Sequence, residues 1–270
     1  MKNILILGHT GMLGRAVQFY FSGNPEFKLL TIPEGVRWPS QEFKRELLKA
    51  DWVINCIGAI PQRTPSKADL FAVNTELPIY LLSLGINTIH AATDCEYSGK
   101  IKLGEYYNIE DYEDAYDDYG ISKKLVTILA KNSYVPAFNI IRTSIIGLEE
   151  QTNFSLLNWA VTQFNNDANI SGFTNHYWNG ITTLEWAKVA EALINLDMEE
   201  AAFIQPTIKT LSKYELLGLI KEVFTPDSKT VISAVESEKF QNKSLEPNAQ
   251  VNSIKDQLVE LKEWYDLTKV

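Results

Sequence analysis

The sequence predicts an α/β protein with a doubly wound parallel sheet and a smaller lobe formed by the C-terminal part of the chain. Short apolar runs alternate with amphipathic stretches through residues 1–148, which is the pattern of successive βαβ units. The apolar runs are nearly continuous, as expected for strands that helices cover on both faces. Strands are expected at residues 3–7, 27–32, 51–56, 86–91 and 137–142, and helices at residues 12–22, 40–49, 66–84 and 117–132.

The pattern changes after residue 148. The sequence there predicts helices at 153–165, 182–196 and 211–224, strands at 168–173 and 201–205, and a looser, charged stretch to residue 250. No internal repeat or low-complexity linker interrupts the chain. We therefore expect a sheet domain over residues 1–148 and a smaller lobe over 149–270, with the elements near 182–205 packing back onto the sheet.

Composition limits the classes of partner. The 270 residues carry a formal net charge of −9, and an acidic surface repels nucleic acid and anionic membranes. Two isolated cysteines form neither a disulfide framework nor a zinc cluster, and three scattered histidines favour no metal site. The N-terminus lacks a signal-peptide layout, and no apolar run approaches the ~18 residues of a membrane span. We expect a cytoplasmic protein that acts as a monomer or homodimer on a small molecule.

A glycine-rich loop, Gly8-His9-Thr10-Gly11-Met12-Leu13-Gly14, joins the first strand to the first helix. One glycine permits a tight turn, a second permits close approach of a phosphate, and a third lets the helix pack against the strand. Backbone N–H groups at the helix N-terminus would then face a pyrophosphate. The loop predicts a Rossmann-type site for NAD(P). The alternative is an ordinary glycine-rich turn between a strand and a helix.

Two charged residues bear on the choice of dinucleotide. Glu34, 20 residues after Gly14, is placed to bind the ribose 2′-hydroxyl of NAD, whereas Arg37 is placed to meet the 2′-phosphate of NADP. The alternative is that both are solvated loop charges. Since no acid stands directly at the end of strand 27–32, we expect NADP(H) to be favoured, with NAD(H) also possible.

A tyrosine and a lysine, Tyr119 and Lys123, lie one turn apart at the start of a predicted helix. A phenol is a poor proton donor–acceptor near neutral pH until its phenolate is stabilised, and an ammonium group nearby does this. Thr93 lies 26 residues earlier, just after strand 86–91. Because catalytic groups in open parallel sheets gather at the carboxyl ends of strands, these three residues predict a single catalytic site.

These motifs resemble those of the extended short-chain dehydrogenases/reductases that act on nucleotide sugars, and within them the dTDP-4-dehydrorhamnose reductase family. The resemblance spans nearly the whole chain. It rests on the glycine loop and on residues 53–58, Asn74, 93–99, 119–123 and 141–144, with weaker similarity at 175–180 and 243–245.

The resemblance implies reduction of a nucleotide-linked 4-keto-6-deoxyhexose in the biosynthesis of cell-surface polysaccharide. Thr93 would hydrogen-bond the substrate carbonyl, Tyr119 would be the acid, and Lys123 would hold the ribose and lower the tyrosine pKa. The implied cofactor-binding residues are Gly8, Thr10, Gly11, Met12, Leu13, Gly14, Arg37, Cys56, Gly58, Ala59, Asn74, Tyr119 and Lys123. The implied substrate-binding residues are Arg63, Asp94, Tyr97, Asn175, Tyr177, Trp178 and Lys243.

Departures from the family keep alternatives open. Ile145 stands where the reductases carry an aromatic residue, so the hexose is open. The related 4,6-dehydratases carry Thr-Asp-Glu, whereas Cys95 takes the third place here and Glu96, shifted by one, is expected to turn away. Dehydration is therefore disfavoured. An NAD-dependent nucleotide-sugar 4-epimerase and a non-catalytic cofactor-binding subunit on the same fold remain as alternatives.

Other polar residues are expected to be structural. His90 is interpreted as a histidine of the sheet interior, and Arg142 as tying the end of its strand to nearby carbonyls. Arg63 and Lys67 are candidates for a diphosphate. Most of the acids before Tyr119 are expected to form a solvated rim, namely Glu105, Glu110, Asp111, Glu113 and Asp114. The aromatic group Phe173, Tyr177 and Trp178 would either stack on a base or sugar or form the core of the lobe.

Overall fold

The computed structural model describes residues 1–64, 66–133, 135–149, 155–196 and 201–267. Within these ranges the chain forms two compact units. The first contains residues 1–98, 112–142 and 186–204, and the second contains residues 99–111, 143–185 and 205–270. Residues 99–111, expected within the sheet domain, thus belong to the second unit. There the backbone N–H of Tyr107 donates to the carbonyl of Ser244 at 2.9 Å, so this segment is held by residues far along the chain.

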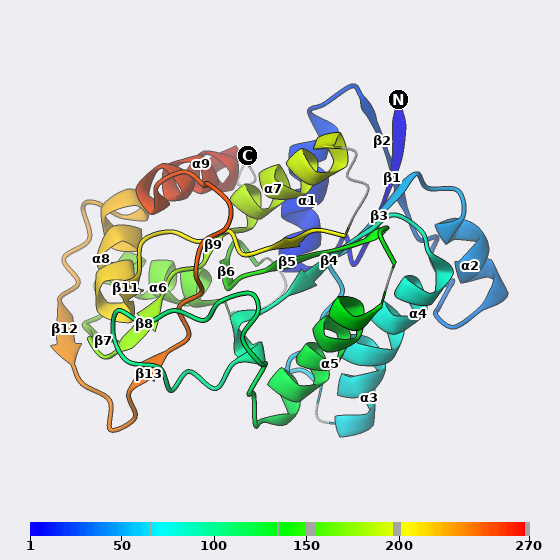
Figure 1. Cartoon of the computed structure of the whole chain (residues 1–270). Coiled ribbons are helices and arrows are strands. Elements are labelled where there is room, and N and C mark those ends of the chain that lie inside the picture. The colour runs from blue at the N-terminus through cyan, green and yellow to red at the C-terminus, as the bar shows by residue number, and fades with distance from the viewer. Residues whose placement is uncertain (65, 134, 150–154, 197–200, 268–270) are drawn as a thin grey trace. The chain divides into compact units, whose positions relative to one another are not determined.

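The first unit is built on a six-stranded sheet of order β10-β5-β4-β3-β1-β2, in which every neighbouring pair is parallel. Figure 1 shows α4 and α5 on one face of this sheet and α1 with α7 on the other. The elements are β1 Lys2–Leu7, α1 Met12–Ser22, β2 Phe27–Thr31, α2 Gln41–Leu47, β3 Trp52–Asn55, α3 Lys67–Phe71, α4 Leu77–Leu84, β4 Thr88–Ala92, α5 Asp118–Asn132, β5 Phe138–Arg142, α7 Thr183–Leu196 and β10 Phe203–Ile204. The predicted doubly wound parallel sheet is confirmed.

The strand order places a topological switch point at β1. The chain passes from β1 to β2 on one side and then returns to pair β3 with the other side of β1. Ligands of open α/β sheets bind beyond the carboxyl ends of the strands at such a point. Alternate residues of β1 face opposite helical layers, and Leu5 and Leu7 pack in the core cluster that includes Leu81 of α4 and Val126 of α5.

The helix expected over residues 66–84 is interrupted. A π-helical turn at Ala72–Glu76 separates α3 from α4. Pro78 explains the break, because it has no N–H to donate to the carbonyl of Asn74 four residues earlier. The wider turn directs Asn74 and Thr75 into the interior, where both are buried.

The second unit combines short strands with three helices. Its elements, apart from the first turn of α7, are β6 Ile145–Ile146, α6 Leu156–Asn165, β7 Ile170–Phe173, β8 His176–Trp178, β9 Ile181–Thr182, β11 Leu211–Ser212, α8 Lys213–Phe224, β12 Ile232–Val235, β13 Gln241–Asn242 and α9 Ile254–Leu267. The helix expected from residue 153 begins at Leu156, and positions 153 and 154 lie outside the described residues. In the described parts of the chain, no helix is long and apolar enough to cross a membrane.

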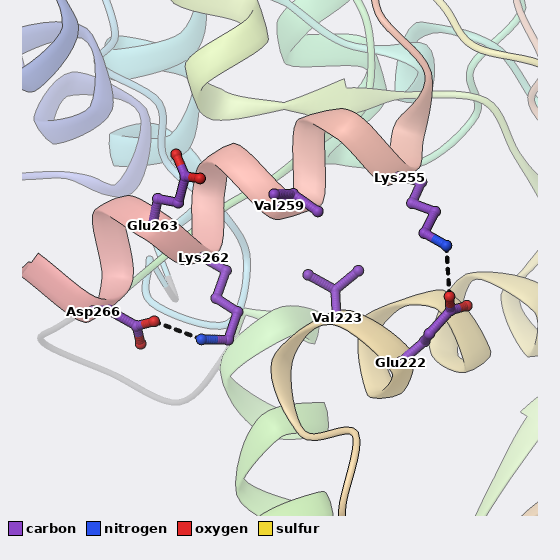
Figure 2. A pocket seen from close by; sticks show the side chains of 7 residues that line it. All are labelled: Glu222, Val223, Lys255, Val259, Lys262, Glu263 and Asp266. Atoms are coloured by element: carbon purple, nitrogen blue, oxygen red, sulfur yellow. Dashed lines mark hydrogen bonds and ion pairs between the residues drawn. The ribbon is translucent and has the colours of Figure 1, made fainter.

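Helix α9 was not predicted, although its buried residues Ile254, Leu258, Leu261 and Trp264 recur at helical spacing. A surface groove of about 330 Å³ lies between α8 and α9. Figure 2 shows its polar edge, where Lys255 pairs with Glu222 at 2.7 Å and Lys262 pairs with Asp266 at 2.5 Å. These exposed pairs link α9 to α8 and stabilise α9 internally, each by a small amount.

Candidate active site

The glycine loop has the geometry that a dinucleotide pyrophosphate requires. Gly8 adopts φ +77°, a conformation that residues with a side chain rarely adopt. A Cβ at Gly14 would stand 2.1 Å from the carbonyl oxygen of Gly8, so only glycine lets α1 pack this close to the loop. The N-cap, Gly11, supplies no side-chain hydrogen bond to the helix N-terminus. The N–H groups of the first turn therefore have no capping side chain, which fits a site for an anion.

A cavity of about 600 Å³ adjoins this loop at the switch point. It is lined by Gly8 to Thr10, by the segment after β2 that includes Glu34, Arg37 and Trp38, and by Ile57 after β3. Both Glu34 and Arg37 therefore lie at the cavity, and the Arg37 guanidinium donates to the carbonyl of Val36 at 3.1 Å. The volume and position suit the adenosine half of a dinucleotide.

Thr93 and Tyr119 come together at the carboxyl end of β4. The side chain of Thr93 lies near the phenol of Tyr119, close enough to lower its pKa. Gly120 makes this approach possible, since a Cβ there would stand 2.3 Å from the carbonyl oxygen of Cys95. The start of α5 can therefore lie directly against the turn that follows Thr93. Sequence reasoning did not identify Gly120, although a glycine in the first turn of a helix is a signal of close packing.

The phenol of Tyr119 remains protonated around neutral pH. Burial raises its pKa above the usual value, and the side chains of Cys95 and Asp94 raise it further, while the side chain of Thr93 opposes the shift. The resemblance implies that Lys123 lowers this pKa, whereas in the structure the largest cause of the shift is burial, which raises it. Tyr119 is thus held in the form that can donate a proton.

Lys123 lies one turn after Tyr119 in α5 and is 4% exposed. Its ammonium group donates to the carbonyl of Ala91 in β4 at 2.7 Å, which fixes it beside Thr93. Burial lowers the pKa of Lys123 to about 8, and the carboxylate of Glu96 opposes that shift. His90, in the same strand, is fully buried, and the Asn55 amide lies 3.1 Å from its ring nitrogen Nδ1. As expected, it is a histidine of the sheet interior.

Asn74, expected at the cofactor, is fully buried and holds the site together from within. Its side chain accepts from the N–H of Ala59 at 2.8 Å and donates to the carbonyl of Ala59 at 2.9 Å and to the Ser122 hydroxyl at 3.1 Å. These hydrogen bonds fix the loop after β3 against α5, and contact of Asn74 with the cofactor stays a prediction. Gly58 in the same loop is exposed, and Cys56 is partly exposed. Leu13 is 5% exposed. Contact of Cys56, Gly58 and Leu13 with the cofactor stays a prediction.

A buried group of charges underlies the site and corrects several expectations. Arg142 pairs with carboxylates rather than carbonyls, namely Glu96 at 3.0 Å and Glu113 at 2.5 Å. Glu113, expected on a solvated rim, is 3% exposed. Its charge is compensated there by a second ion pair, with Lys131 at 2.7 Å. Tyr97, expected at the substrate, is 1% exposed, and its hydroxyl accepts from Arg142. The other four acids of the expected rim are exposed.

The remaining predicted substrate residues divide between the two units. In the first unit, Asp94 accepts from the Thr93 hydroxyl at 3.1 Å, and Arg63 is exposed in the loop after β3. In the second unit, Asn175, Tyr177 and Lys243 are partly exposed, whereas Trp178 is 3% exposed. Trp178 lies under the Lys213 ammonium at 5.5 Å and belongs to the lobe core, which favours the structural alternative for this residue. Among the described residues no group of histidine, cysteine and acidic side chains could hold a metal.

Comparisons with known proteins place this geometry in a fold. No protein-family model matches the chain, and no curated protein matches it in sequence. The dTDP-4-dehydrorhamnose reductase of Bacillus anthracis, solved with NADP, matches with a TM-score of 0.81 at 15% identity over 96% of this chain and 98% of that one. The dTDP-4-dehydrorhamnose reductase of Clostridium acetobutylicum matches with a TM-score of 0.78 at 19% identity, over 99% of this chain and 100% of that one. The UDP-glucose 4-epimerase of Thermotoga maritima, solved with UDP-glucose, matches with a TM-score of 0.77 at 12% identity, over 99% of this chain and 100% of that one.

The chain therefore has the Rossmann-type fold that these reductases and this epimerase share. The resemblance to the dTDP-4-dehydrorhamnose reductases, found first in the motifs, extends to the fold along nearly the entire chain.

Proposed function

We propose that this protein is an NAD(P)H-dependent reductase of a nucleotide-linked 4-keto-6-deoxyhexose. The observation that carries the proposal is the set of Thr93, Tyr119 and Lys123 at the carboxyl end of β4, where the Thr93 side chain lies near the Tyr119 phenol and the Lys123 ammonium group donates to the carbonyl of Ala91. When bound, the dihydronicotinamide would supply the hydride. The glycine loop and the cavity beside it fit the pyrophosphate and adenosine of such a cofactor.

The residues of the chain would divide the remaining work. Thr93 would hydrogen-bond the keto oxygen and hold it beside the phenol of Tyr119. Tyr119 would donate its proton to that oxygen as negative charge develops on it. Lys123 would bind the cofactor ribose and, as an ammonium group, stabilise the phenolate that remains. The raised pKa of Tyr119 supports the acid role, because the phenol carries its proton throughout the neutral range.

Turnover with a panel of nucleotide-linked 4-keto-6-deoxyhexoses tests the proposal. We expect each mole of keto sugar to consume one mole of NAD(P)H. The loss of absorbance at the dihydronicotinamide band measures this consumption. A nucleotide-sugar 4-epimerase, whose fold is equally similar, would interconvert two sugars without net consumption of cofactor. Epimerisation without net oxidation, or cofactor binding with no turnover of any keto sugar in the panel, would contradict the reductase proposal.

For the cofactor we propose NADPH over NADH. Support comes from Arg37 at the cavity beside the glycine loop, and from Ile32 and Pro33, which follow β2 directly, so that no acid stands at the end of that strand. Arg37→Ala should raise KM for NADPH at least roughly tenfold, the effect of about 1.4 kcal/mol, and leave KM for NADH nearly unchanged. Glu34→Gln is the matched control at the same rim. An equal effect of Arg37→Ala on both cofactors would show that Arg37 is only a loop charge.

A further inference from the structure

Glu96 is an acidic side chain with no exposed surface, placed three residues after Thr93. It ends the short 3₁₀ turn Asp94–Glu96, which Thr93 caps through a hydrogen bond from the N–H of Cys95 at 3.2 Å. The sequence suggested that Glu96 turns away from the site. In the structure its carboxylate is buried beneath the site, among the elements that carry the catalytic set.

Three contacts connect Glu96 to those elements. Its Oε1 accepts from the Thr127 hydroxyl at 3.1 Å, and Thr127 lies one helical turn after Lys123 on the same face of α5. Its Oε2 lies 3.0 Å from Nε of Arg142, which ends β5. Its backbone carbonyl accepts from the N–H of Ala115 at 3.0 Å, in the segment that leads into α5. One residue thus links the turn of Thr93, the helix of Tyr119 and Lys123, and the adjacent strand.

Resting on the function proposed above, we infer that Glu96 is a positioning residue for Lys123. The buried carboxylate of Glu96 stabilises the ammonium form of Lys123 and fixes α5 against the turn that carries Thr93. A buried ammonium group needs a counter-charge that solvent does not supply. The ribose contact and the stabilisation of a Tyr119 phenolate both require Lys123 to be charged. Glu96 therefore acts on the reaction through Lys123, without contact with the substrate.

The charges around the two residues support this assignment. Lys123 faces Glu96 from the 3₁₀ turn and His90 from β4, and burial together with Lys123 keeps the pKa of His90 well below its usual value, so His90 is neutral. Glu96 faces Arg142, Lys123 and Glu113. Burial raises the pKa of Glu96, and Arg142 and Lys123 oppose that shift. The pKa of Arg142 is raised, so its guanidinium stays charged and both Glu96 and Glu113 are paired with it. The effects of these two carboxylates on Lys123 can therefore be compared directly.

Glu96→Gln and Glu113→Gln form a matched pair for the test. Each removes one carboxylate from Arg142, but of the two carboxylates only Glu96 contributes to the pKa shift of Lys123. The readout is NMR titration of the Lys123 side chain in protein labelled at lysine, assigned by its loss in Lys123→Met. We expect Glu96→Gln to lower the pKa of Lys123 by roughly 1 unit, as befits loss of a nearby opposite charge, and Glu113→Gln to leave it in place.

Glu96→Asp keeps the charge but withdraws it by one methylene, and it should give a smaller shift in the same direction. If Glu96→Gln does not fold, this variant carries the comparison with Glu113→Gln. An unchanged Lys123 pKa in the Glu96 variants, or an equal shift in the Glu113 variant, would overturn the inference. Because the titration requires no turnover, its result stands apart from that of the keto-sugar assay. If the reductase proposal holds, the alkaline limb of kcat/KM should move to lower pH in Glu96→Gln alone.

Discussion

Burial acts in opposite chemical directions on Tyr119 and Lys123, the two titratable residues at the centre of the site. It keeps the phenol protonated and makes the ammonium group easier to deprotonate, since in both cases the charged form is disfavoured. Tyr119 is therefore ready to donate a proton. Lys123 needs local support to remain charged, and the carbonyl of Ala91 and the carboxylate of Glu96 provide it.

Replacing Tyr119 by phenylalanine tests the acid role. Tyr119→Phe should lower kcat by roughly 10²–10⁴-fold, the usual contribution of a positioned acid, while cofactor affinity stays within a few-fold. Steady-state turnover and a fluorescence titration with NADPH provide the two measurements. Tyr97→Phe is the matched control, because Tyr97 hydrogen-bonds Arg142 beneath the site and is expected to affect stability more than turnover. Near-normal turnover of Tyr119→Phe would exclude Tyr119 as the acid.

Replacing Lys123 by methionine should separate activity from stability. Its folded-state pKa of about 8 lies below the ordinary 10.5, so the unfolded chain binds the proton more tightly. Burial of the ammonium group therefore lowers the free energy of unfolding. This loss is greatest below pH 8, the pKa in the folded state, and it disappears as the pH rises past about 10.5, the pKa in the unfolded chain. Lys123→Met should therefore abolish turnover yet raise the free energy of unfolding by about 1–3 kcal/mol at pH 7.

Urea unfolding of Lys123→Met and wild-type protein at pH 7 and at pH 10 measures that difference. The gain should be largest at pH 7 and fall to roughly a quarter of that value at pH 10. A variant less stable than wild type at pH 7, or a gain that does not depend on pH, would show that burial of the ammonium group carries no such cost.

Helix α1 and its glycines illustrate how closely the elements of the first unit pack. A Cβ at Gly14 would meet the carbonyl oxygen of Gly8 at 2.1 Å, and backbone on both sides prevents easy relief. Gly14→Ala should lower the free energy of unfolding by about 3 kcal/mol and abolish cofactor binding, because α1 must move away from the loop. Denaturant unfolding and an NADPH titration are the measurements.

Gly23→Ala, at the other end of α1, is the control for that substitution. Gly23 adopts φ −78°, and a Cβ there meets only the carbonyl of Tyr20 at 3.6 Å, an ordinary contact. This variant should bind the cofactor normally and differ from wild type by at most ~0.5 kcal/mol. Equal behaviour of the two variants would mean that close packing at Gly14 does not shape the site.

The elements of the sheet could be predicted from sequence because each depends on its own local pattern. The apolar strands, the glycine loop and the start of α5 at the Asp117 N-cap are all encoded within a few residues. The interruption at Pro78 was equally local and could have been recognised. The partners of Glu113 could not, since Lys131 and Arg142 lie in different elements and the local run of acids resembles an exposed face. Burial of Glu96, Tyr97 and Trp178 likewise depends on contacts distant in sequence.

Across the whole chain, the two units carry different parts of the proposed function. The glycine loop, the cavity and the Thr93–Tyr119–Lys123 set all belong to the first unit. The partly exposed candidates Asn175, Tyr177 and Lys243 belong to the second. The shared fold hosts reduction in one neighbour and epimerisation in another, so the fold alone does not choose the substrate. We propose that recognition by the second unit makes that choice.

If the second unit recognises the nucleotide, a nucleotide-linked 4-keto-6-deoxyhexose should have a kcat/KM at least roughly 10³-fold above that of the free keto sugar. A diphosphate and a base would add charge-assisted and stacking contacts that the free sugar cannot make, and three contacts of about 1.4 kcal/mol each would together give that factor. Lys243→Ala and Tyr177→Ala should raise KM for the nucleotide sugar and leave the free sugar unaffected. Trp178→Phe, altered within the lobe core, is the control that tests stability alone. Comparable kcat/KM for the two substrates would mean that the second unit does not read the nucleotide, and the proposed substrate class would fall with it.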